Sequence, residues 1–494
     1  MAALCTLGID IGTTGLKAVV LHRDHGIVAQ TARPHELISL HPGWAEEDPE
    51  QWWATTREAV RELLEIVPSA DIAAIGVSGM VPALVLLDAS GQPVRPSIQQ
   101  NDARTIAEVA ELRAAVNAEE FFTITGNVVN QQNIDPRWRW LQQYEPENVA
   151  RTAHICGSYD FIRFRLTGEL ALEENWAAES ALYDVRLHDW HVPYLEHAGI
   201  DASLLPPVKQ PAAVAGKISK EAAEATGLHI GTPVVTGSAD HVAAALAAGL
   251  TQTGDLLLKF GGAGDVLYCT NQPDPDPHFY FDYHDIPGMT MINGCMATSG
   301  SLVKWFAHQL AEGMSLSALD REAETIPPGS DGIILLPYFL GEKTPIFDPS
   351  ARGVFAGLML HHTRAHLYRS VLEAVCYGFA HHLLLLYKSG RPVQRVLAAD
   401  GGSRSKLWMQ ITADVTNHPV EVVTGEAASA LGTAFVAAMG VHLFRDWNEI
   451  TRFVTRGPVY HPQKDAVQRY QKGFALYQEL YGRLQSFLPE LAHL

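Results

Sequence analysis

The hydrophobic pattern of residues 1–34 predicts three β strands joined by tight turns. Apolar and polar positions alternate in LCTLGID (4–10), LKAVVLH (16–22) and IVAQTAR (27–33), which is the period of two that strands give. The turns between them are IGTTG and RDHG. A helix follows, because Asp48, Pro49 and Glu50 supply an N-cap, a first-position proline and a first-turn acid.

Strands and helices continue to alternate along the chain, which predicts the α/β fold class. IAAIGVSG (72–79) and ALVLLDASG (83–91) are predicted strands, and residues 231–237 form a further buried strand. After Gly249 the order starts again, because GDLLLKFGGAGDVLYCT (254–270) repeats the strand, glycine turn and strand of LGIDIGTTGLKAVVL (7–21). This internal echo predicts two similar α/β domains, residues 1–248 and 249–494. Residues 464–494 are predicted to end the chain as an amphipathic helix.

Composition narrows the class of protein. The 494 residues are enough for two large cores. The formal charge is −19, from 36 basic and 55 acidic residues, so the chain lacks the basic surface of a nucleic-acid binder. Anionic ligands remain compatible with this charge, because backbone N–H groups and a metal ion supply local positive potential.

The cysteines and the N-terminal residues indicate in which cellular compartment the protein is expected. The five cysteines are scattered and form no CxxC pair, which favours reduced thiols over disulfides or a zinc site. The N-terminus lacks the pattern of a signal peptide, and no apolar run reaches the length of a membrane-spanning helix. We therefore expect a soluble cytoplasmic protein with no membrane partner.

The first glycine turn carries candidate chemistry. Asp10 ends a strand, and Gly12, Thr13, Thr14 and Gly15 form the turn after it. Glycines allow an anion close to the backbone, and the exposed N–H groups then bind phosphate. An acid at the strand end is suited to holding Mg²⁺, directly or through water. The alternative is a plain β-hairpin with an acid at its mouth.

Two further glycine turns lie in the second half. Gly261, Gly262 and Gly264 separate two strands, and Asp400-Gly401-Gly402 ends a strand before a helix that begins near Ser403–Ser405. A helix N-terminus after glycines favours an anion or nucleotide, although each turn alone is compatible with a purely structural role. Three such turns, divided between two domains, predict a nucleotide held in a cleft between the domains.

Asp240 is a lone carboxylate among small residues in VVTGSADHVAAALAAG (234–249). The pattern places it between a buried strand and a helix N-terminus, which favours the charged form of a carboxylate. A carboxylate facing a hydroxyl and a terminal phosphate is the usual base of phosphoryl transfer. The alternative is a first-turn acid that stabilises its helix by about 0.3–1 kcal/mol. Asn101 and Asp102 are predicted either to bind sugar hydroxyls or to cap a helix.

These motifs together resemble the FGGY carbohydrate kinases over essentially the whole chain. GIDIGTTGLKAVV is similar to the first phosphate motif of that family, and GWAEEDPEQWW, NDAR and FLGEKTPIFDPSARGVFAGL resemble its xylulokinase-type branch. LYRSVLEAVCYGFAH, ADGGSRSKLWMQITADVTNHPVEV and EAASALGTAFVAA, which begins at Glu426, resemble the C-terminal part.

The resemblance implies two actin-like, ribonuclease-H-type domains that close around ATP and a sugar, with Mg²⁺ as the cofactor. By position, Asp240 matches the catalytic base and Asp10 the acid that organises Mg²⁺. The resemblance places the other nucleotide-binding residues at the first phosphate loop (Thr13, Thr14, Lys17), the second (Gly261, Gly262, Gly264) and the nucleoside site (Gly300, Gly401, Gly402, Ser403, Lys406). A homodimer is a further expectation from the family.

The chain departs from the family pattern at two places. Xylulokinases carry Gln-Met-His-Gly where this chain has Met80-Val81-Pro82-Ala83, so the segment that contacts the sugar has lost polar groups. Gly262 and Ala263 offer no hydroxyl in the second phosphate loop. The predicted substrate is a ketopentose, D-xylulose first, with another ketose or a small polyol, such as a ribulose isomer or a tetritol, as the alternative. A sugar- or nucleotide-binding sensor and an actin-like structural ATPase are the alternatives outside catalysis.

Overall fold

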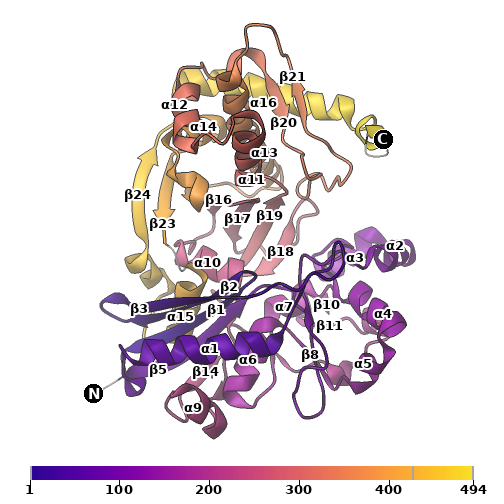
Figure 1. Ribbon diagram of the computed structural model, residues 1–494, viewed down its shortest axis with the longest axis vertical. Coiled ribbons are helices and arrows are strands. Elements are labelled where there is room, and N and C mark those ends of the chain that lie inside the picture. The colour runs from indigo at the N-terminus through magenta and orange to yellow at the C-terminus, as the bar shows by residue number, and fades with distance from the viewer. Residues whose placement is uncertain (1–2, 426–427, 492–494) are drawn as a thin grey trace.

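The computed structural model describes residues 3–425 and 428–491, and these residues build two halves, each around a seven-stranded sheet (Figure 1). The order of the N-terminal sheet is β13-β14-β5-β1-β2-β3, with β15 beside β5. Its strands are β1 (Cys5–Gly12), β2 (Gly15–His22), β3 (Gly26–Pro34), β5 (Ile72–Gly79), β13 (Val214–Lys217), β14 (Pro233–Val235) and β15 (Ser238–Ala239).

The C-terminal sheet has the order β18-β19-β17-β16-β22-β23-β24. Its strands are β16 (Asp255–Phe260), β17 (Gly264–Thr270), β18 (Tyr280–Tyr283), β19 (Thr290–Met296), β22 (Arg395–Ala399), β23 (Val420–Thr424) and β24 (Thr455–Tyr460). In both sheets three antiparallel strands are followed by two parallel ones: β3-β2-β1-β5-β14 matches β19-β17-β16-β22-β23. The predicted α/β class and the internal echo are therefore confirmed.

Helices cover both sheets, and each half has its own large apolar core. The helices of the N-terminal half are α1 (Pro49–Leu64), α2 (Ile106–Ala115), α3 (Ala118–Thr125), α4 (Ile134–Tyr144), α5 (Pro146–Arg151), α6 (Ser158–Thr167), α7 (Glu174–Glu179), α8 (Val192–Ala198), α9 (Lys220–Thr226) and α10 (Asp240–Ala247). Those that follow are α11 (Gly300–Leu310), α12 (Leu316–Glu324), α13 (Arg364–Lys388), α14 (Lys406–Thr416), α15 (Ala428–Gly440), α16 (Lys464–Leu484) and α17 (Leu488–Leu491).

Some predicted elements are shorter in the structure. The helix α1 begins as expected, with the Asp48 side chain accepting the Glu50 N–H at 3.0 Å. The strand predicted over 83–91 is reduced to β6 (Val85–Leu87), and the strand predicted over 231–237 is reduced to β14. The C-terminal helix divides into α16 and α17, and residues 492–494 lie outside the described residues.

Helix α13 is long and apolar enough to cross a membrane by length and composition alone. Most of it is buried inside the C-terminal half, where it packs against α14, α12 and β20 (Ile334–Leu336). Its apolar character is that of a core helix.

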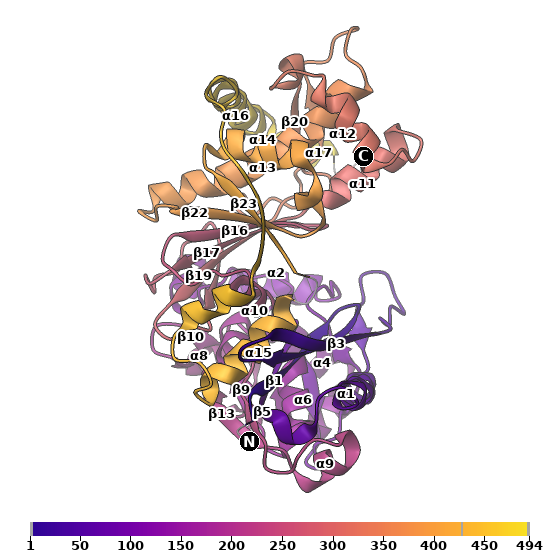
Figure 2. The same ribbon diagram turned by 90° about the vertical axis from the view of Figure 1, so that its left-hand side faces the viewer.

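Helix α15 crosses from the C-terminal part of the chain to the N-terminal sheet (Figure 2). It packs on β1, β5 and α10, which all belong to the N-terminal half. Gly8 of β1 allows this approach, because a Cβ there would lie 2.0 Å from the Ala430 carbonyl oxygen. A helix from the C-terminal part of the chain thus packs on the N-terminal sheet, whose strand β1 carries Asp10. Glu426, at which the EAASALGTAFVAA segment begins, lies outside the described residues.

Candidate active site

Asp10 lies at the end of β1, almost fully buried. Its carboxylate accepts a hydrogen bond of 2.9 Å from the Ser78 hydroxyl on the neighbouring strand β5. Burial and the nearby negative charge of Asp240 raise the pKa of Asp10 to about 7, against the opposing effects of Ser78, Lys17 and Lys259. Asp10 and Asp240 are therefore close enough for their charges to interact, and together they concentrate negative charge at the end of β1.

Asp240 is the first residue of α10, directly after β15, and its side chain is partly exposed. The prediction that a strand-to-helix turn presents it at a helix N-terminus is thus confirmed. Gly237, between β14 and β15, lets the chain approach β5 closely before this turn, because its φ is +106° and a Cβ there would lie 2.0 Å from the Val77 carbonyl oxygen. One Asp240 oxygen, Oδ1, accepts the His241 backbone N–H at 2.6 Å.

The first glycine turn is a two-residue hairpin. Thr13 and Thr14 join β1 to β2, and the Thr14 carbonyl accepts the His35 N–H at 3.1 Å. Thr14 and Lys17 are exposed, and Lys17 pairs with Asp10 in the strand register. Thr13 and Thr14 thus follow Asp10 in the turn and Lys17 lies opposite it on β2, while their contact with phosphate remains a prediction.

The second glycine turn is fixed by the start of α11. The Gly261 carbonyl accepts the Gly300 N–H at 2.8 Å, and the Gly262 carbonyl accepts the Ser301 N–H at 3.1 Å. A Cβ on Gly300 would lie 2.6 Å from the Gly261 oxygen. Gly300 thus allows α11 to seat against the turn, which is a packing role that the sequence did not reveal.

The third glycine segment surrounds Asp400. This residue has a φ of +73°, and Gly401–Arg404 form a short 3-10 helix before α14. The Ser403 hydroxyl donates to the Asp400 carbonyl at 2.7 Å, while exposed Lys406 opens α14. The predicted helix start is confirmed. Gly402 packs closely, since a Cβ there would meet the ring of Trp408 at 2.6 Å.

Lys259 is a candidate residue that sequence reasoning missed. Its Nζ lies 3.5 Å from an Asp265 oxygen and 4.0 Å from an Asp400 oxygen. Burial lowers the pKa of Lys259, but Asp265, Asp400 and Asp240 outweigh that effect and raise it. Lys259 stands two residues before its glycine turn, as Asp10 does, and pairs with Asp265 as Asp10 pairs with Lys17. The first hairpin thus has an acid opposite a lysine, and the second has a lysine opposite an acid. This reversed pair is the sequence signal that could have identified Lys259 as a site residue.

The predicted sugar-contact segment is buried and held by its backbone. Met80 and Val81 lie in the N-terminal core. The Pro82 carbonyl accepts a hydrogen bond of 2.7 Å from buried Arg137, and the Ala83 carbonyl accepts one of 2.9 Å from the Trp176 indole. The backbone of the segment is thus held by two hydrogen bonds, and its Met80 and Val81 side chains are apolar and buried.

The two residues of the NDAR loop differ in their surroundings. Asn101 is exposed, whereas the Asp102 carboxylate accepts hydrogen bonds from Arg104 at 2.9 and 2.7 Å and from the Ala45 N–H at 2.7 Å. The Arg104 guanidinium also stacks on Trp44, 3.8 Å from the ring centre. Helix α2 begins only at Ile106, so neither residue caps it. Asp102 orders the loop, and its contact with a sugar remains a prediction.

Comparison with known proteins identifies the family. The chain matches the N-terminal domain of the FGGY family of carbohydrate kinases over residues 5–247 and the C-terminal domain over residues 258–441. It is 30% identical to the xylulose kinase of Bacillus subtilis, covering 96% of each chain. The structure resembles that of a xylulose kinase from Rhodospirillum rubrum, with a TM-score of 0.95, 43% identity and coverage of 98% and 99%.

Solved structures with this fold include kinases named for different substrates. A gluconate kinase from Lactobacillus acidophilus superposes with a TM-score of 0.93 at 25% identity, over 99% of each chain. The comparisons confirm the two actin-like, ribonuclease-H-type α/β domains. The chain therefore belongs to the FGGY family of carbohydrate kinases, and it is a sugar phosphotransferase that takes its phosphoryl group from ATP.

Proposed function

We propose that this protein transfers the γ-phosphoryl group of ATP to a hydroxyl of a ketopentose, with D-xylulose as the first candidate. The observation that carries the proposal is the position of Asp240, which opens α10 beside Asp10 and close enough to Lys259 to raise its pKa. A partly exposed carboxylate between the two sheets is suited to accept the hydroxyl proton. The glycine turns on either side are suited to bind phosphates through backbone N–H groups.

Asp10 is the residue that we propose to hold Mg²⁺. Burial, together with the negative charge of nearby Asp240, raises the pKa of the Asp10 carboxylate to about 7. Carboxylate oxygens are the ligands that Mg²⁺ prefers, together with substrate phosphates. When bound, the ion would neutralise charge on the phosphates. The chain's own contribution is to keep Asp10 fixed through Ser78 and Lys17 opposite it.

The choice among sugars rests on the names of the relatives and on one apolar segment. Several relatives at 24–43% identity are named xylulose kinase, which supports D-xylulose. The buried Met80-Val81 pair offers fewer polar contacts than the family pattern, which favours the alternative of another ketose or a small polyol. A sensor without catalysis is disfavoured because Asp10 and Asp240 are both in place.

A screen of sugars tests the proposal. The purified protein is supplied with ATP, Mg²⁺ and one ketopentose, ketohexose, tetritol or aldonate at a time, and ADP release is followed by a coupled assay. We expect D-xylulose to give the highest kcat/KM. If another ketose or a polyol stimulates ADP release and D-xylulose does not, that compound replaces D-xylulose as the assigned substrate. Absence of sugar-stimulated ADP release throughout the panel would refute the kinase proposal.

The charge of Lys259 should matter for the nucleotide. We expect Lys259→Gln to lower kcat/KM for ATP about 10- to 100-fold, because the carboxylates of Asp265 and Asp400 lose their cation and the phosphates meet uncompensated negative charge. Steady-state kinetics with varied ATP checks this. Lys220→Gln is the matched control, since Lys220 is exposed and pairs only loosely with Glu224. Equal kinetics for both variants would remove Lys259 from the nucleotide site.

The cysteines bear on location. All five are unpaired, and four are buried. This supports a reducing compartment, and we propose a cytoplasmic enzyme. The homodimer stays a prediction from the family, to be checked by light scattering.

A further inference from the structure

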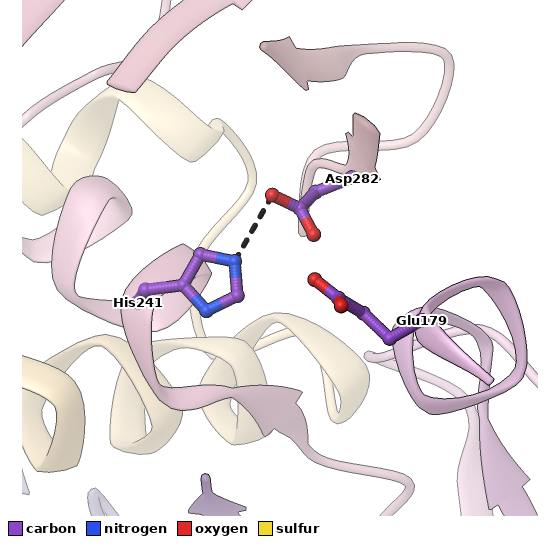
Figure 3. Close-up of side chains that lie close together, drawn as sticks. All are labelled: Glu179, His241 and Asp282. Atoms are coloured by element: carbon purple, nitrogen blue, oxygen red, sulfur yellow. Dashed lines mark hydrogen bonds and ion pairs between the residues drawn. The ribbon is translucent and has the colours of Figure 1, made fainter. Parts of the chain in front are cut away.

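Three ionisable side chains meet beside Asp240 (Figure 3). They are His241 on α10, Asp282 on β18 and Glu179 at the end of α7, and one polar atom of each lies within 4.8 Å of the others. His241 Nε2 lies 3.0 Å from Asp282 Oδ2. Asp282 is fully buried, and Figure 3 shows the Glu179 carboxylate facing it from the other side.

The cluster joins the two halves of the molecule. Glu179 and His241 come from the N-terminal half, whereas Asp282 lies on the edge strand of the C-terminal sheet. The Asn175 side chain fixes this strand against α7, because it accepts the Tyr283 N–H at 2.7 Å and donates to the Tyr283 carbonyl at 3.0 Å. The position of Asp282 relative to His241 is thus set by contacts between the halves.

His241 also holds Asp240 directly. Its backbone N–H donates to Asp240 Oδ1 at 2.6 Å, and its ring Nδ1 lies 3.4 Å from the same oxygen. Two nitrogens acting on one oxygen restrict rotation of the carboxylate, and this fixes the place of Asp240 Oδ2. The imidazole is in turn anchored by Asp282 on its far side.

The partners of the imidazole define its protonation. Asp240 and Asp282 are both acceptors, so the ring serves both only as an imidazolium with a proton on each nitrogen. Burial lowers the pKa of His241, but Asp282 and Asp240 outweigh it and raise the pKa well above its usual range. Burial and Asp282 raise the pKa of Glu179 well above its usual range, which favours its protonated form. Asp285 is a further acid near the ring, and burial raises its pKa to about 7 against the opposing effects of Ser238 and His241.

We propose that His241, anchored by Asp282 and Glu179, is a positioning residue that fixes the orientation of the base Asp240. The inference rests on the proposed function, in which Asp240 accepts the substrate proton. Because Asp282 belongs to the other half, the orientation of the base depends on how the halves are seated. A hydrogen bond already joins His241 to Asp282, which favours this role over that of a metal site for the same three side chains.

Kinetics of three variants test the role. Asp282→Asn and His241→Gln should each lower kcat about 10- to 100-fold, as a misoriented catalytic group does, while the KM for the sugar changes less than about threefold. Glu179→Gln keeps a donor toward Asp282 and should retain most of kcat. The matched control is His278→Gln, because His278 pairs with Asp276 at 2.9 Å on a loop outside the cluster. Unchanged kcat in both Asp282→Asn and His241→Gln would overturn the proposal.

The pH profile separates positioning from simple loss of structure. Removing the negative charge of Asp282 lowers the pKa of His241, so the alkaline fall of kcat should move to lower pH in Asp282→Asn and stay in place in His278→Gln. A profile of Asp282→Asn that matches wild type would contradict the inference.

Measurements without turnover complete the test. In ¹⁵N-histidine-labelled protein, the signals lost in His241→Gln should show an imidazolium at pH 7.5 in wild type. A neutral ring, or a stoichiometric transition metal found by elemental analysis, would overturn the proposal. If wild type shows no sugar-stimulated turnover, the proposed function fails while the nitrogen shifts still test the arrangement. If Asp240→Asn is inactive and the His241 variant is fully active, this inference fails alone.

Discussion

Replacing Asp240 with asparagine is expected to lower kcat for sugar phosphorylation about 10²- to 10⁴-fold, the usual contribution of a general base. The amide has the shape of the carboxylate and keeps an oxygen for the His241 N–H, which Asp240 accepts at 2.6 Å. It has no basic oxygen to accept the hydroxyl proton. The KM for ATP and the melting temperature should stay close to wild type, because the side chain is partly exposed and small.

The control for Asp240→Asn separates catalysis from helix stabilisation. Asp465 stands in the first turn of α16, exposed and away from the glycine turns. Asp465→Asn removes the same interaction with a helix N-terminus, about 0.3–1 kcal/mol, and should leave kcat unchanged. Near-native turnover by Asp240→Asn would show that Asp240 is only a first-turn acid, the alternative that the sequence left open.

The parts of the site that were predictable from sequence are those encoded by short local patterns. Asp10 lies near the end of a buried strand, just before a turn, and Asp240 opens a helix directly after a strand, so the local setting of each is fixed within a few residues. The glycine turns are equally local. The alternation of strands and the echo between residues 7–21 and 254–270 predicted two similar sheets, since strand order follows the repeated unit.

The other parts depend on contacts between distant segments. Lys259 joins the site only because β17 and β22, the two neighbours of its own strand β16, bring Asp265 and Asp400 to it. Glu179 and Asp282 reach His241 from separate halves, and no spacing in the sequence relates them. In the NDAR loop the sequence did not reveal that Asp102, a candidate sugar ligand, is paired with Arg104. Polar side chains in a loop predict that hydrogen bonds form, but not whether the partner is a ligand or another residue of the protein.

Gly432 links the C-terminal part of the chain to the base. It lies on α15 where that helix crosses α10, and a Cβ there would lie 2.0 Å from the Ala243 carbonyl oxygen, one turn after Asp240. Both helices are buried against the N-terminal sheet, so neither helix can shift to make room for the added methyl group without displacing the elements packed on it. Overpacking of this kind costs about 1–3 kcal/mol.

We therefore expect Gly432→Ala to lower the free energy of unfolding by about 1–3 kcal/mol and to lower kcat up to about 100-fold, because a shift of α10 displaces the catalytic carboxylate. Denaturant melts and steady-state kinetics measure the two effects. Gly482→Ala is the matched control: Gly482 lies in α16 with open space around a Cβ, so the same change should stabilise the helix by up to about 1 kcal/mol with kcat unchanged. A stable, fully active Gly432→Ala would show that α10 keeps its place without this close contact. Reduced activity in Gly432→Ala but not in Gly482→Ala would show that α15 helps to hold the base in position.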